Sequence, residues 1–65
     1  MSVANIYKKY IDGESLTDKE VIEGREAFQK ASDHLIILGP YFNIAFKEAN
    51  RTYLALNDMY IARFN

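Results

Sequence analysis

His34 is the only histidine in this 65-residue chain, and it is the first residue to consider for catalysis or metal binding. Helical metal sites place their ligands three or four residues apart, and Lys30 occupies the position four residues before His34. Asp33 is the sequence neighbour of His34, so it projects from a different side of a helix. The chain has no cysteine, so a transition-metal site would need carboxylates beside one imidazole. We predict no metal site and no general-base role for His34.

The serines offer no nucleophilic site. Ser2, Ser15 and Ser32 have no identifiable base or oxyanion-hole motif nearby. Residues 12–14 lack the ligand and glycine spacing of a calcium loop. The three glycines are scattered at positions 13, 24 and 39, so they form no phosphate-binding loop. We therefore expect no catalytic residues and no cofactor, and the prediction is a protein that is not an enzyme.

Nucleic-acid binding is the next chemistry to consider, because nine residues are aromatic. Lys8 and Lys9 lie between Tyr7 and Tyr10, which is a small local match to the basic and aromatic pattern of single-strand binders. The chain nevertheless carries a formal net charge of −1, whereas nucleic-acid binders concentrate positive charge. A nucleic-acid-associated helical module remains an alternative. Its phosphate-binding residues would be Lys8, Lys9, Lys47 and Arg51.

The elements that position these residues are predicted to be helices, and the clearest spans about residues 18 to 38. Thr17 and Glu20 have the spacing of a capping box, and Leu16 and Val21 that of a hydrophobic staple. The predicted apolar stripe of this helix has alternating spacings of three and four. It comprises Val21, Gly24, Phe28, Ala31, Leu35 and Leu38.

Gly39-Pro40 interrupts the helical pattern. Proline cannot donate an amide hydrogen and would clash with the Ile36 carbonyl in a straight helix, but it suits the first turn of a new helix. We predict a further helix from about residue 40 to about residue 63. Its apolar stripe comprises Phe42, Ala45, Phe46, Ala49, Tyr53, Leu56, Met59 and Tyr60.

These two helices are expected to form an antiparallel hairpin. The apolar spacing continues in phase through Gly39-Pro40, so one long kinked helix is an alternative. The hairpin is favoured because it places large residues opposite small ones, and such layers interdigitate without voids. The predicted facing pairs are Leu35 with Phe42, Ala31 with Phe46, Phe28 with Ala49, Gly24 with Tyr53, and Val21 with Leu56.

A short helix is predicted before the hairpin. Ser2 is a possible N-cap, and Asp12-Gly13 is expected to end the helix. Its apolar residues recur at helical spacing and are Ile6, Tyr7, Tyr10 and Ile11. We expect it to cover a second stripe on the last helix, formed by Leu54, Ile61 and Phe64. The predicted fold is a single all-α domain over residues 1–65, a small helical bundle with a short N-terminal helix and a long hairpin turning at Gly39-Pro40.

Some apolar surface has no predicted partner within this bundle. The chain is 49% hydrophobic, which is generous for so short a sequence and indicates that apolar area remains for another surface. We predict that the partner-binding residues are Ile36, Ile37, Tyr41 and Ile44. The expected partner is a second copy, giving a homodimer, or another protein. A structural subunit of a larger assembly is a further alternative.

The longest strongly apolar run, residues 35–38, is far too short to span a bilayer. The first residues lack the charged region and the long apolar run of a secretory signal. The lack of cysteine fits a reducing compartment. The sequence thus predicts a soluble cytoplasmic protein with no membrane partner.

The pattern Leu16-Thr17-Asp18-x-Glu20, followed by Leu38-Gly39-Pro40-x-Phe42 and a long closing helix, resembles a group of short open reading frames in tailed bacteriophages. The resemblance implies a phage-like accessory protein, and small phage products of this kind commonly bind and modulate a host protein. It carries over no catalytic or binding residues.

Overall fold

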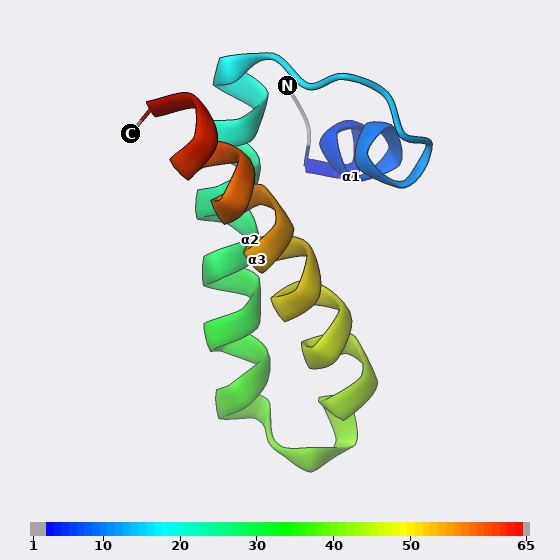
Figure 1. Cartoon of the computed structure of the whole chain (residues 1–65). Helices are drawn as coiled ribbons and strands as arrows, with labels where there is room; N and C mark the ends of the chain where they lie inside the picture. The colour runs from blue at the N-terminus through cyan, green and yellow to red at the C-terminus, as the bar shows by residue number, and fades with distance from the viewer. Residues whose placement is uncertain (1–2, 65) are drawn as a thin grey trace.

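Two long helices that run side by side in opposite directions form most of the molecule (Figure 1). The computed structural model describes residues 3–64, in the order α1 (Val3–Ile11), α2 (Asp18–Leu38), the 3-10 helix η1 (Pro40–Phe42) and α3 (Asn43–Phe64). α1 lies near the end of the pair that is away from the turn. The predicted all-α bundle with a short first helix and a long hairpin is confirmed. The predicted Ser2 cap lies outside the described residues.

The start of α2 is a complete capping box. The Glu20 backbone N–H donates to the Thr17 hydroxyl at 3.1 Å, and the Thr17 backbone N–H donates to the Glu20 carboxylate at 2.9 Å. Leu16 and Val21 are both buried, as expected for a hydrophobic staple. The local signals therefore placed the beginning of α2 correctly.

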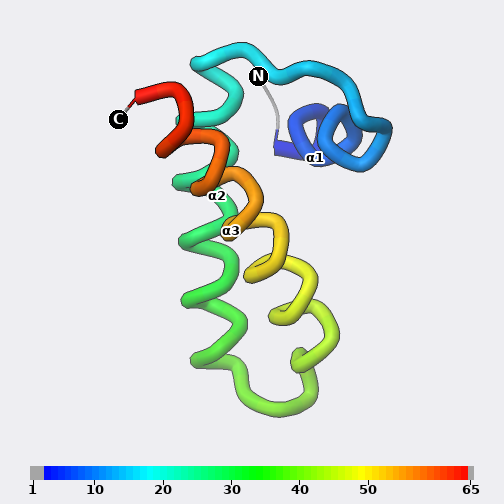
Figure 2. The backbone as a smooth tube through the Cα atoms, viewed as in Figure 1, coloured from blue at the N-terminus to red at the C-terminus, as the bar shows by residue number. Residues whose placement is uncertain are grey.

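The chain reverses between α2 and α3, as the backbone trace shows (Figure 2). Gly39 has φ 97°, a conformation that side-chain-bearing residues rarely adopt, and its N–H donates to the Ile36 carbonyl at 3.3 Å. Pro40 then begins η1, where its missing N–H costs no helical hydrogen bond. The single kinked helix is excluded. The predicted third helix is divided into η1 and α3, and it ends at Phe64.

The two helices are paired about one turn away from the predicted register. A methyl group added at Gly24 would lie 2.9 Å from Ile6 Cγ2 and 3.0 Å from Leu56 Cδ1, and no atom of Tyr53 lies within 4 Å of it. Next to this point, Arg25 Nε donates to the Asn57 side-chain oxygen at 2.7 Å. The prediction that Gly24 faces Tyr53 is therefore wrong. The predicted turn at Gly39-Pro40 was very short, whereas the chain reverses over Gly39 and the 3-10 helix that follows it.

The core lies at the end of the hairpin where α1 adds a third helix. Its buried cluster contains Ile6, Leu16, Val21 and Leu56, and Phe28, Met59 and Tyr60 pack against it while partly exposed. Toward the turn, α2 and α3 have only each other to pack against. The predicted core positions Leu38, Phe42 and Ala45 are consequently exposed, and that part of the predicted core is wrong.

One buried apolar side chain and two polar contacts hold α1 in place. Ile6 enters the space above Gly24, and the Tyr7 ring lies 5.8 Å from the Phe28 ring. The Tyr7 hydroxyl donates to Glu48, and Lys9 pairs with Glu20, both at 2.9 Å. The chain then leaves α1 through Gly13, whose φ is 75°, as the Asp12-Gly13 signal predicted.

The stripe that α1 was expected to cover is uncovered. Leu54 is 51% exposed, and Ile61 and Phe64 are exposed as well. The prediction is wrong because α1 packs where Gly24 leaves room for Ile6, and that place is the junction of α2 and α3.

Leu56 is fully buried, so Leu56→Ala is expected to lower the free energy of unfolding by about 2–5 kcal/mol through the lost apolar contacts and the cavity left behind. Urea denaturation followed by circular dichroism measures the change. Leu54→Ala is the matched control, since it removes the same atoms from an exposed position of the same helix. Equal effects of the two variants would contradict the described core.

The capping box predicts a pH dependence of stability. The Thr17 backbone N–H and the Lys9 ammonium hold the pKa of Glu20 below its ordinary value of 4.5, despite the opposing effect of burial. A lowered pKa in the folded state means that the ionised carboxylate stabilises the fold above the unfolded-state pKa, and that this contribution disappears as the pH falls through the folded-state pKa.

Glu20→Gln is therefore expected to lower the melting temperature at pH 7 and to have progressively less effect as the pH falls from about 4.5 toward 3. Thermal unfolding of both proteins across this range measures the difference. Glu26→Gln, at an exposed position of the same helix, serves as the control. A Glu20→Gln deficit that persists unchanged at pH 3 would contradict the role of the ionised carboxylate.

Candidate functional site

An uncharged apolar surface surrounds the hairpin turn. No Asp, Glu, Lys, Arg or His occurs from residue 35 to residue 46. The structure exposes 96% of Tyr41, 86% of Ile44 and 80% of Ile37. We call this surface the tip patch, and it comprises Ile36, Ile37, Leu38, Tyr41, Phe42 and Ile44.

The local fold explains why these side chains face outward. Ile36, Ile37 and Leu38 form the last residues of α2, Tyr41 and Phe42 belong to η1, and Ile44 lies in the first turn of α3. Consecutive residues of a helix project on different sides, so two packed helices cannot bury all of them. A third helix would be needed to cover the remainder, and α1 lies at the other end of the hairpin. All four predicted partner-binding residues are thus exposed and lie close to the same turn.

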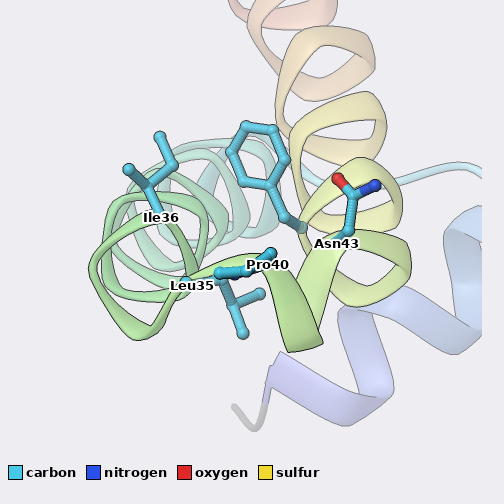
Figure 3. Close-up of a pocket in the computed structure, with 6 residues that line it drawn as sticks. Leu35, Ile36, Pro40 and Asn43 are labelled. Carbon is cyan, nitrogen blue, oxygen red and sulfur yellow. The ribbon is translucent and has the colours of Figure 1, made fainter.

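A hollow of about 330 Å³ opens beside the patch, between the end of α2 and the start of α3. Leu35 and Ile36 come from α2, Pro40 from the turn and Asn43 from α3 (Figure 3). Gly39 and Phe46 complete the lining. The walls are mostly apolar, and the Asn43 side chain supplies an amide group. The hollow therefore has the chemistry to receive an apolar or aromatic group with one polar atom.

The tip patch gathers several exposed apolar side chains near one turn. Its six large apolar residues are between 44% and 96% exposed. Because consecutive residues of a helix project on different sides, these side chains surround the turn and do not form one flat face. Clusters of exposed apolar side chains mark surfaces that bind other molecules, so this end of the hairpin is the candidate functional site.

Within the part of the chain that the structure describes, His34 belongs to no metal-binding cluster. His34 lies exposed on α2, one turn before the tip patch. Within residues 3–64, no three residues of the types His, Cys, Asp and Glu form a cluster that could hold a metal ion. His34 therefore contributes an isolated imidazole on the surface.

A polar cluster around Glu48 was not predicted from the sequence. The Glu48 carboxylate accepts hydrogen bonds from the Tyr7 hydroxyl and from Arg51, and its backbone carbonyl accepts one from the Thr52 hydroxyl at 2.9 Å. The hydrogen bond to Glu48 raises the pKa of Tyr7, which keeps the phenol protonated. The Tyr7 hydroxyl therefore serves as a hydrogen-bond donor, and the cluster joins α1 to α3. Tyr7 and Glu48 are 41 positions apart, so no local sequence pattern could indicate this contact.

Two of the four cations considered for phosphate binding are engaged within the fold. Lys9 pairs with Glu20, and Arg51 pairs with Glu48. Lys8 and Lys47 are exposed. A phosphate would have to compete with these carboxylates for Lys9 and Arg51.

No family model, curated protein or solved structure matches this chain. Among the helices described over residues 3–64, none combines the length and the apolar character that crossing a membrane requires.

Proposed function

We propose that this chain is a protein-binding module without enzymatic activity, and that the tip patch is its binding surface. The observation that carries the proposal is the exposure of six large apolar residues around a turn with no charged side chain nearby in sequence. Desolvation of such a surface is favourable and requires no compensating ion pair. Tyr41 adds a large rigid side chain with a hydroxyl group, a residue type that is frequent among the energetically dominant residues of interfaces.

The proposed biological role is that of a phage-like accessory protein that modulates a host protein, acting in the cytoplasm. Support for this role comes from the resemblance of the capping and turn motifs to short phage reading frames. Both motifs are present in the structure as a capping box at Thr17 and a turn at Gly39-Pro40. The two kinds of partner that the tip patch suits are a host protein and a second copy of the chain.

Ile37→Asp is expected to weaken binding to a protein partner at least tenfold, because it places a charge at the centre of an apolar interface. The protein, tagged at its C-terminus, is used to capture partners from host lysate, and each partner is then purified and titrated by isothermal calorimetry. Helix content by circular dichroism is expected to stay unchanged, since Ile37 is 80% exposed.

Leu54→Asp is the control, because it introduces the same charge at an exposed apolar residue of α3 outside the tip patch. The proposal requires that Leu54→Asp bind as the wild type does. It is wrong if Ile37→Asp binds every purified partner with unchanged affinity, or if neither a host protein nor a second copy binds the wild-type chain.

A further inference from the structure

We propose that α1 is a detachable strap over a helix-binding groove between α2 and α3, and that a helix with the pattern of α1 takes its place when the strap opens. The pattern is an isoleucine, a hydroxyl donor one residue later and a cation three residues later, as in Ile6, Tyr7 and Lys9. This second site is independent of the tip patch, because α1 lies at the opposite end of the hairpin (Figure 1).

The attachment of α1 depends on little buried surface. Of its nine residues Ile6 alone is buried, and the apolar side chains of Val3 and Ile11 are 43% and 56% exposed. A helix this short is marginal in water unless tertiary contacts stabilise it. We therefore expect the docking of α1 and its helical structure to be lost together, at a lower free energy than global unfolding requires.

The hairpin has an N-terminal boundary of its own. The capping box of α2 joins Thr17 to Glu20 and uses no atom of α1. Leu16 and Val21 are buried beside it, whereas the connecting residues 12–15 are exposed. α1 can therefore move away without unwinding the start of α2.

Opening of the strap leaves a notch with a carboxylate on each side. The bare backbone of Gly24 forms its floor and Leu56 one wall, and the branched side chain of Ile6 fills it in the closed state. Because α2 and α3 are antiparallel, Glu20 lies on the side of the notch away from the turn and Glu48 on the side toward it (Figure 1). Both carboxylates accept a hydrogen bond from α1, so each loses a donor when the strap opens.

The two carboxylates differ in what they then require. Glu48 keeps the Arg51 guanidinium on its other oxygen, so its charge stays compensated and a neutral donor suffices. Glu20 is 1% exposed and keeps the neutral Thr17 N–H, but it loses its cation. A buried carboxylate without an opposite charge is costly, so this side of the groove requires a positive charge.

These requirements identify the occupant as a basic amphipathic helix. Its isoleucine fills the notch, its hydroxyl donor reaches Glu48 and its cation reaches Glu20. α1 meets both polar requirements with contacts of 2.9 Å. An acidic helix is disfavoured by like-charge repulsion, and a larger side chain than isoleucine is disfavoured by the closeness of Leu56 to Gly24.

Hydrogen exchange of the wild-type full-length protein tests whether the strap opens by itself. The amides of residues 7–11, beyond the first turn of α1, are expected to have protection factors at least about tenfold smaller than those of residues 24–28 of α2. Their exchange is also expected to depend less on urea, because less surface is exposed when the strap opens. Equal protection and equal urea dependence in the two helices would mean that α1 leaves only on global unfolding, and the proposal would be overturned.

Titration of the labelled full-length protein with a peptide of residues 1–13, followed by NMR, tests the groove. Ile6→Ala in the protein weakens the strap and leaves the groove intact, so this variant is expected to bind the peptide about tenfold more tightly than the wild type does. The amides of Gly24 and Leu56 are expected to shift. Ile11→Ala in the protein is the matched control and is expected to bind as the wild type does, since it truncates an exposed isoleucine of the same helix.

A peptide that itself carries Ile6→Ala is expected to bind at least about tenfold more weakly, because it leaves the notch empty. Equal binding of the two peptides, or no gain in affinity from Ile6→Ala in the protein, overturns the proposal. Tyr7→Phe in the protein is the milder variant should Ile6→Ala fail to fold. It removes the bond to Glu48 while keeping the ring, and a smaller gain in peptide affinity is expected.

Ile37→Asp separates this proposal from the proposed function. The variant alters the tip patch, and it is expected to leave both the exchange of α1 and the binding of the peptide unchanged. A change in either would contradict the independence of the two sites.

Discussion

The fold depends on the close approach of three helices at Gly24. The space that a side chain would occupy there is filled by Ile6 from α1 and Leu56 from α3. This contact allows a chain of 65 residues to bury a continuous apolar cluster without cysteine. Glycine in the middle of a helix costs about 1 kcal/mol relative to alanine, so its place in α2 is explained by packing and not by helix propensity.

The position of this contact also determines where the candidate site lies. Since α1 is bound at the end of the hairpin away from the turn, it cannot cover the apolar residues at the turn. Lys9 and Tyr7 reinforce that position by pairing with Glu20 and Glu48. The exposed tip patch is thus a consequence of how the core is built. Only one short helix packs beside the hairpin. The apolar residues at that end are therefore buried, and those at the turn stay exposed.

Glu20 takes part in both a local contact and a contact between helices. Its carboxylate completes the capping box of α2 and also receives Lys9 from α1. Buried carboxylates are tolerated where hydrogen bonds and an opposite charge compensate for the lost hydration, and both are present here. One side chain therefore fixes the beginning of the hairpin and the position of the helix that packs against it.

The sequence alone determined the features that depend on neighbouring residues. Thr17 and Glu20 placed the start of α2, and Gly39-Pro40 placed the turn, because capping and backbone conformation are local. Residues close to the turn were likewise recognised as surplus apolar surface. The sequence did not determine the register of α3 against α2, the position at which α1 packs, or the Glu48 cluster. These depend on how many residues the turn consumes and on contacts between distant segments, such as Tyr7 with Glu48. Only the tertiary structure decided them, because side chains that fit equally well in several registers are distinguished by the packing of all three helices at once.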